Sequence, residues 1–204
     1  MPPEAKQIYF NELAERWDSL PGPGDATSRI GALVGRCSDG PVAGWVLDAG
    51  CGTGVLLPAL LDRHLPSCRI IEFDFAERML RVNVAKNLGE RVKHVCGDSH
   101  LLPLRDESLD LAICFGLYPH LDQPEAALRE MLRALKPGGL LAVCHLRPSH
   151  ELNAFHSTID GPVAGDYLPP AGELKAHLCR LGAVDVVAEE SPDLYLVRGT
   201  KARP

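Results

Sequence analysis

The residues with the clearest chemical potential lie at positions 46–54, Val-Leu-Asp-Ala-Gly-Cys-Gly-Thr-Gly. Glycine lets the backbone adopt positive φ, and it lets a ligand approach the chain without a Cβ in the way. A glycine-rich turn between a strand and a helix is where nucleotide-like ligands dock in α/β proteins. The glycines Gly50, Gly52 and Gly54 follow the spacing G-x-G-x-G. Dinucleotide-binding turns have the spacing G-x-G-x-x-G, so this turn is a poor match to a dinucleotide site.

Two further acids lie at the ends of predicted strands. Asp74 ends the run 69–74 and lies 20 positions after Gly54, about the offset at which ribose-binding acids occur. A carboxylate there can accept hydrogen bonds from both ribose hydroxyls, and charged acceptors form the stronger bonds. Asp74 could equally cap the helix that follows, and the two roles are compatible. Asp98 follows the run 92–96 and is expected at the sheet edge where ligands bind.

Histidines provide the candidate acid–base chemistry. His120 lies in the loop after the apolar run 109–115. An imidazole is suited to removing a proton near neutral pH because its ordinary pKa is about 6.5. The alternative is a structural histidine that is hydrogen-bonded to the loop backbone, and the sequence leaves both roles open.

A second group of polar side chains contains His145, His150, Asn153 and His156. If Ser149 begins a helical turn, Asn153 and His156 share its face, and His145 can point to the same place. Imidazoles there could bind an acceptor, act as a base or ligate a metal. The spacing matches no recognised metal site, so acceptor binding, metal binding and a solvated surface all remain open.

A parallel sheet would bring these residues to one edge. Predicted strands at 69–74, 92–96, 109–115 and 140–146 alternate with helical patterns at 55–64, 75–88 and 123–135. This alternation is typical of an α/β fold. Helices are also expected at 8–20 and at 170–181. A further helix, capped by Asp25 or Ser28, is expected to end at about residue 36, while 147–170 is predicted to be irregular. Two final strands, 184–189 and 193–199, are predicted to pair with each other.

Bulk properties narrow the possible functions. The 204 residues favour one domain, and the net charge of -6 argues against a nucleic-acid groove. No apolar run approaches the roughly 20 residues that span a bilayer, and the N-terminus lacks a signal-peptide core, so a cytoplasmic location is expected. The 7 scattered cysteines disfavour a disulfide framework or a cysteine zinc site.

The turn at 46–54 resembles motif I of the class I S-adenosylmethionine-dependent methyltransferases. The run 127–139, Ala-Leu-Arg-Glu-x-x-Arg-x-Leu-Lys-Pro-Gly-Gly, closely resembles the segment before strand five of that family. The segment that begins Tyr9-Phe10-Asn11-Glu12 is similar to N-terminal segments of small-molecule methyltransferases. The resemblance covers nearly the whole chain. It implies a Rossmann-like, seven-stranded, mostly parallel sheet with helices on both faces and a C-terminal antiparallel strand pair.

The resemblance also implies S-adenosylmethionine as cofactor, with S-adenosylhomocysteine as product. Asp48 would orient the loop or meet the amino group of the cofactor, while Asp74 would bind the ribose. Phe75 and Met79 would pack on the adenine or belong to the core. The implied cofactor set is Asp48, Gly50, Cys51, Gly52, Gly54, Asp74, Phe75, Met79, Asp98, Ser99 and Phe115.

The acceptor side is expected after strand four, where many relatives carry polar pairs. The candidates are His120 as base and Tyr118, His145, Asn153 and His156 as substrate contacts, with no metal assigned. The predicted function is methyl transfer to a small-molecule acceptor by in-line displacement. The alternatives are a non-catalytic cofactor-binding protein and an oxidoreductase, which the glycine spacing and the final strand pair disfavour.

The expected organisation is a single methyltransferase domain over residues 1–204. Residues 1–40 would form a helical lid, and residues 147–170 a substrate-side insertion. Nucleic acid is not expected as acceptor, because the loop after strand four lacks the Asn/Asp-Pro-Pro-Tyr/Phe tetrad of amino-directed base methyltransferases. The oligomeric state is left open.

Overall fold

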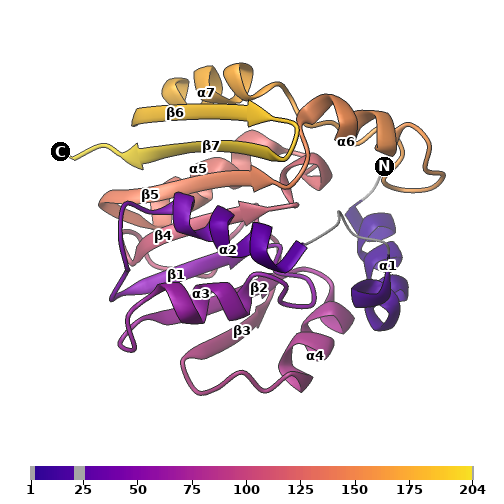
Figure 1. The fold of residues 1–204 in the computed structure, drawn as a ribbon, viewed down its shortest axis with the longest axis horizontal. Coiled ribbons are helices and arrows are strands. Elements are labelled where there is room, and N and C mark those ends of the chain that lie inside the picture. The colour runs from indigo at the N-terminus through magenta and orange to yellow at the C-terminus, as the bar shows by residue number, and fades with distance from the viewer. Residues whose placement is uncertain (1–2, 21–25, 204) are drawn as a thin grey trace.

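The computed structural model describes residues 3–20 and 26–203. Helices and strands alternate along most of the chain, as the sequence predicts (Figure 1). The helices are α1 (Pro3–Leu13), α2 (Ala26–Cys37), α3 (Leu57–Arg63), α4 (Glu77–Ala85), α5 (Pro124–Ala134), α6 (Ser149–His156) and α7 (Ala171–Arg180), with 3₁₀ helices η1 (Ala14–Ser19) and η2 (Tyr118–His120). The strands are β1 (Trp45–Ala49), β2 (Arg69–Asp74), β3 (Val92–Cys96), β4 (Leu109–Phe115), β5 (Leu135–His145), β6 (Ala183–Ser191) and β7 (Leu194–Lys201).

The described residues form a seven-stranded sheet with the order β3-β2-β1-β4-β5-β7-β6. Strands β1 to β5 pair in parallel, while β7 pairs antiparallel with both β5 and β6. The strand order reverses beside β1, between β2 and β4, so the carboxyl end of β1 is the crevice where α/β sheets bind ligands. This arrangement confirms the predicted fold class, including the terminal antiparallel pair.

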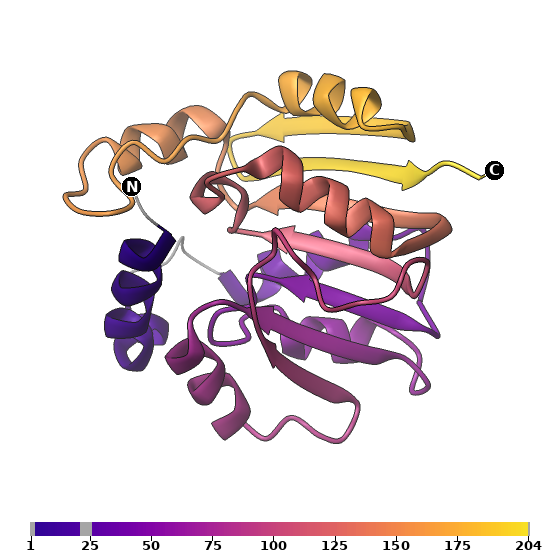
Figure 2. The ribbon, with the colours of Figure 1, turned by 180° about the vertical axis from the view of Figure 1, so that it is seen from behind.

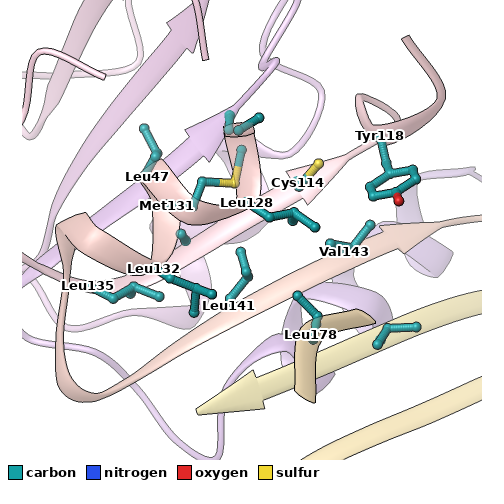
Figure 3. Close-up of a cluster of buried hydrophobic side chains, with 14 of the residues drawn as sticks. Leu47, Cys114, Tyr118, Leu128, Met131, Leu132, Leu135, Leu141, Val143 and Leu178 are labelled. Carbon is teal, nitrogen blue, oxygen red and sulfur yellow. The ribbon is translucent and has the colours of Figure 1, made fainter. Parts of the chain in front are cut away.

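Side chains alternate along the strands, and each face of the sheet has its own apolar core. On one face, Leu47 of β1 and Leu141 of β5 pack with Leu128 of α5 and Leu178 of α7 (Figure 3). Figure 2 shows the sheet from this side, with α5 lying across it. On the other face, Val46 and Ile113 pack with Leu33 of α2 and Leu60 of α3. Helices therefore cover both faces, and the sheet edge at the carboxyl ends of the parallel strands is left for the loops.

Helices α1 and α6 lie beyond that edge (Figure 1). A third apolar cluster joins Phe10 of α1 to Met79 of α4 and to Val163 of the segment that follows α6. Residues from 3–20 and from 147–170 therefore meet over the carboxyl ends of the strands. Positions 21–25 of the expected lid segment lie outside the described residues.

Most observed bounds lie within a few residues of the predicted ones, and the first helix and strand β5 differ most. The first helix begins at Pro3 rather than residue 8 and ends at Leu13, where η1 continues. Its buried side chains include Lys6, ahead of the predicted start, whereas the predicted apolar positions Ile8 and Leu20 are exposed. Strand β5 begins at Leu135 rather than residue 140. Leu135 pairs with Leu109, and a register shift then takes up residues 136–139.

The segment 147–170 is not irregular throughout, because α6 begins at Ser149 and ends at His156. Ser149 and Ala171 are the first residues of α6 and α7. Their backbone N–H groups both donate to the carboxylate of Glu190 in β6. No helix within residues 3–20 and 26–203 is both long and apolar enough to cross a membrane.

Candidate functional site

The glycine turn after β1 is held against the end of β2. The backbone N–H groups of Gly50 and Cys51 both donate to the carbonyl of Phe73, at 2.7 and 3.1 Å. The N–H of Gly52 donates to Oδ2 of Asp74 at 2.8 Å. These bonds need positive φ at Gly50 and Gly52, which is 72° and 54°.

Gly52 and Gly54 have different surroundings. A Cβ at Gly52 would meet no atom within 4 Å, whereas a Cβ at Gly54 would lie 2.5 Å from Oδ1 of Asn83. Gly52 therefore opens its backbone to the space above the turn, and Gly54 allows α4 to pack closely below it. Among the predicted cofactor residues, Gly54 and Asp48 do not line the cavity described next.

A cavity of about 410 Å³ lies at this edge of the sheet, a volume in the range of small-molecule sites. It contains most of the predicted cofactor residues and the predicted base. Those that line it are Gly50, Cys51, Gly52, Asp74, Phe75, Met79, Asp98, Ser99, Phe115 and His120. Residues as far apart in the sequence as Gly50 and His120 are thus brought to one concave surface, as the parallel topology requires.

Asp74 is the most constrained acid of the cavity. Its Oδ2 accepts from Gly52 and its Oδ1 accepts from the N–H of Ala76 at 2.7 Å. Burial raises the pKa of the Asp74 carboxyl, and the two backbone donors offset part of this shift. The N-cap of α4 is Ala76, so Asp74 orients the turn before the helix and keeps lone pairs available for a ligand.

Asp98 is exposed by comparison and is paired with a residue that the sequence analysis missed. Its Oδ1 accepts from the backbone N–H of His100 at 2.9 Å and from Nδ1 of the same histidine at 2.5 Å. Nε2 of His100 accepts from the backbone N–H of Gln123 at 3.3 Å. Because Nε2 accepts and Nδ1 donates, His100 ties the acid after β3 to the start of α5.

Two carboxyl groups are buried together behind the turn. Asp48 of β1 and Glu72 of β2 are directly opposite partners in the sheet, and both point to the face covered by α2 and α3. Glu72 Oε2 accepts from Nδ2 of Asn83 at 2.6 Å, while Asp48 Oδ2 and Glu72 Oε1 have no partner among the described residues. Burial raises the pKa of Glu72 to about 7. Burial and the neighbouring carboxylates raise that of Asp48 well above its ordinary value.

The N-terminal helix supplies a wall that spacing alone did not assign. Lys6, Gln7 and Phe10 of α1 line the cavity, as does Trp17 of η1. Nε2 of Gln7 donates to the carbonyl of Phe75 at 2.6 Å. The amphipathic pattern predicted a helix only from residue 8, and the polar residues Lys6 and Gln7 before it gave no signal that they would face inward.

His120 lines the cavity and is held by two distant residues. Its Nδ1 lies 2.6 Å from Oδ2 of Asp166, and its carbonyl accepts from Nζ of Lys6 at 3.0 Å. Lys6 Nζ also forms ion pairs with Asp122 at 3.1 Å and Asp166 at 2.9 Å. Side-chain exposures of 6% for Lys6 and 9% for Asp166 show that this network is buried.

The four other acceptor-side candidates do not line this cavity. Tyr118 lines a second cavity of about 490 Å³ together with Asp166 and Tyr167, and burial raises the pKa of Tyr118 to about 12. His145 is buried with its ring 6.5 Å from that of Phe115, and burial lowers the pKa of His145 to about 3.

Asn153 and His156 have structural partners. Asn153 exchanges two hydrogen bonds with the backbone of Leu168, at 2.9 and 2.8 Å. Nδ1 of His156 donates to the carbonyl of Asp166 at 2.9 Å, and its ring lies 5.3 Å from that of His120. No group of three His, Cys, Asp or Glu side chains in the described part of the chain is arranged to hold a metal ion.

Comparison with known proteins gives the family. A family model described as "Methyltransferase domain" matches residues 47–143. Malonyl-[acyl-carrier protein] O-methyltransferase of Herminiimonas arsenicoxydans is 32% identical over 155 residues, which cover 75% of this chain and 56% of that protein. Demethylmenaquinone methyltransferase of Roseiflexus castenholzii is 31% identical over 166 residues, covering 76% of this chain and 67% of that protein. The chain thus spans between about half and two thirds of the length of these two curated relatives.

Solved structures share the fold. A chain from the complex between the Haloferax volcanii Trm112 methyltransferase activator and its methyltransferase aligns with a TM-score of 0.75 at 18% identity. That alignment covers 95% of this chain and 98% of the other. The glycine turn, the acids after β2 and β3 and the terminal strand pair are accounted for together by one family. The chain belongs to the class I S-adenosylmethionine-dependent methyltransferases.

Proposed function

We propose that this chain transfers a methyl group from S-adenosylmethionine to a small-molecule acceptor. The observation that carries the proposal is the cavity at the carboxyl ends of β1, β2 and β4, which brings the glycine turn, Asp74 and His120 together. When bound, the cofactor supplies a methyl group activated by its sulfonium. The protein then has to bind and orient the reactants, exclude water and accept a proton.

The residues of the cavity fit this cofactor. The open backbone at Gly52 suits a ligand that contacts the turn, as the methionine part would. Asp74 is fixed by two backbone donors, so its remaining lone pairs are oriented to accept from ribose hydroxyls. Asp98 and Ser99 are proposed for the adenine, with Phe75 and Met79 packed beside it and Phe115 near the methionine chain.

Asp48 is proposed to act from behind the turn rather than by direct contact. It does not line the cavity, and it lies beside Glu72 with an unpartnered oxygen, Oδ2. Gly54 does not line the cavity either, and it is assigned a packing role. The space that a Cβ at Gly54 would occupy is taken by the side chain of Asn83.

We infer that residues 1–40 act as the lid of a single domain and that 147–170 form its acceptor side. Gln7 reaches the backbone of Phe75, and Oδ1 of Asn11 accepts from the N–H of Arg78 at 2.8 Å. These contacts hold α1 over the proposed adenine and ribose region. Such closure would exclude water from the reacting atoms.

The acceptor is inferred to be a small molecule. The names of the two curated relatives give malonyl-[acyl-carrier protein] and demethylmenaquinone as their acceptors, and neither is a nucleic acid. The net charge of -6 also disfavours a polyanionic acceptor. His120 is the proposed proton acceptor on this side, since it lines the cavity.

Calorimetry tests the cofactor assignment, and label transfer tests the activity. S-adenosylhomocysteine is expected to bind to the purified protein, while NADH is expected not to bind. Tritiated S-adenosylmethionine should then label at least one member of a small-molecule acceptor panel. Failure to bind S-adenosylhomocysteine would refute the proposed site, and binding without label transfer would favour a non-catalytic role.

A further inference from the structure

We propose that His120 and Asp166 form a general-base pair, and that the acceptor is therefore a hydroxyl compound of the phenol or enol type rather than a carboxylate. This inference rests on the proposed function, which it makes more specific. A carboxylate oxygen needs no base near neutral pH because it has already lost its proton. A phenolic hydroxyl has to lose its proton as it is methylated.

The geometry gives His120 one free nitrogen. Nδ1 lies 2.6 Å from Oδ2 of Asp166, so this nitrogen carries the hydrogen and donates it to the carboxylate. Nε2 has no hydrogen-bond partner within residues 3–20 and 26–203, and the ring lines the cavity. A neutral imidazole in this tautomer presents the lone pair of Nε2, as a general base requires.

Asp166 is the positioning residue, and it is itself held from two sides. Nζ of Lys6 forms an ion pair with it at 2.9 Å and also fixes the carbonyl of His120. Nδ1 of His156 holds the backbone carbonyl of Asp166, and Asn153 holds Leu168 two residues later. Helix α6 thus stabilises the segment that places Asp166 beside His120.

The charge of the cavity argues against an anionic acceptor. Its lining includes the acids Glu4, Asp74, Asp98 and Asp122. Lys6 is the only lysine or arginine among the described residues that line it, and its ammonium already has two carboxylate partners. An acceptor carboxylate would therefore find no available cation, whereas a neutral hydroxyl compound needs none.

The proton and the electrons balance with the groups present. The acceptor oxygen loses its proton to Nε2 of His120 and forms a bond to the methyl carbon. The electron pair of the broken carbon–sulfur bond remains on sulfur. The charged imidazole that results lies beside Asp166, which stabilises it until the proton leaves to solvent.

Nuclear magnetic resonance can test the pair without any acceptor. Long-range proton–nitrogen spectra of the full chain with S-adenosylhomocysteine, at pH 8, report which ring nitrogen of His120 carries hydrogen, and His120→Gln assigns the signal. We expect hydrogen on Nδ1 only. Asp166→Ala should move it to Nε2, Asp166→Glu should restore it to Nδ1, and the exposed control Asp160→Ala should leave it unchanged.

Other results in these spectra would overturn the pair. Hydrogen on Nε2 in the unmodified protein, on both nitrogens at pH 8, or on Nδ1 regardless of Asp166 would each do so. The charged and titratable groups that face the ring are Asp166 of the loop, Lys6 of α1, His156 of α6 and, more remotely, His145 of β5 and Asp74 of β2.

Matched acceptors test the substrate class. Naphthols and the corresponding naphthoates are offered with tritiated S-adenosylmethionine, and S-adenosylhomocysteine affinity is measured in parallel. We expect naphthols to be methylated, and we expect His120→Gln to reduce the methylation rate roughly 100-fold or more. Asp166→Ala should also reduce this rate, and Asp166→Glu should have a higher rate than Asp166→Ala. Preferential labelling of naphthoates, labelling of neither series, or naphthol labelling unaffected by His120→Gln would overturn the acceptor class. If the unmodified protein does not bind S-adenosylhomocysteine, the proposed function itself is contradicted.

Discussion

At the scale of single residues, Asp74 connects the glycine turn to the ligand space. Replacing it by Asn removes the charge and leaves only one oxygen to serve Gly52, Ala76 and a ligand. We expect Asp74→Asn to weaken S-adenosylhomocysteine binding by about 1–3 kcal/mol, the cost of losing a charged hydrogen-bond acceptor. Calorimetry measures this change, with the exposed Asp160→Asn as control. Equal affinity in both variants would remove Asp74 from the site.

Glu72 gives a prediction about stability and pH. Burial raises the pKa of its carboxyl from 4.5 to about 7, so the folded state binds a proton that the unfolded state has lost within this window. The resulting stability is fully present below pH 4.5 and is lost as the pH rises through about 7. Glu72→Gln should therefore make the unfolding free energy less dependent on pH, by up to roughly 1 kcal/mol per pH unit.

Urea unfolding at several pH values between 5 and 8 measures that slope. The matched control is Glu151→Gln, because Glu151 is an exposed residue of α6. The effect should be confined to Glu72→Gln. Parallel curves for the unmodified protein and Glu72→Gln would contradict a raised pKa for this group.

At the scale of elements, α1 is attached to the cavity by polar contacts as well as by the apolar cluster around Phe10. Gln7 lines the cavity and donates to the carbonyl of Phe75. We expect Gln7→Ala to weaken S-adenosylhomocysteine binding by about 0.5–1.5 kcal/mol, mainly through faster dissociation, because a looser lid opens more often. Stopped-flow displacement measures the dissociation rate. Glu12→Ala, an exposed change on the same helix, should have no effect, and equal rates in the two variants would argue against a lid.

The same scale shows why some elements could be predicted from the sequence and others could not. Strands β2, β3 and β4 have the predicted bounds. The near-continuous apolar run of β4 ends before Gly116, β3 ends before Gly97, and β2 ends in the acid Asp74. The inward face of α1 could not be predicted, since Lys6 is buried by ion pairs with Asp122 and Asp166, far away in the sequence. A pattern of hydrophobicity contains no information about such pairs.

At the candidate site, the success of prediction depends on sequence distance. The turn residues Gly50 and Gly52 and the acid Asp74 each follow a predicted strand, and parallel topology alone brings them together. His120 could be singled out by residue type, but its partner Asp166 is 46 positions away in a segment predicted to be irregular. Asn153 and His156 are predicted substrate contacts, and in the structure their hydrogen bonds go to the backbone of that same segment.

At the scale of the whole molecule, the proposed ligand contacts five separate parts of the chain, so it should bind only when all of them are assembled. Lining residues come from α1 and η1, the turn after β1, the end of β2, the loop after β3 and the loop after β4. A ligand specific for the folded state adds RT ln(1 + [L]/Kd) to stability, about 2.7 kcal/mol at a hundredfold excess over Kd. For a chain of 204 residues we therefore expect S-adenosylhomocysteine to raise the Tm by roughly 5–10 °C.

Thermal unfolding with and without the ligand measures this shift. NADH serves as the ligand control, because a cavity built around a G-x-G-x-G turn should give it no stable position. Asp74→Asn serves as the protein control and should show a smaller shift at the same ligand concentration, since a larger Kd reduces RT ln(1 + [L]/Kd). If the unmodified protein melts at one temperature with and without S-adenosylhomocysteine, the five segments do not form a cofactor site.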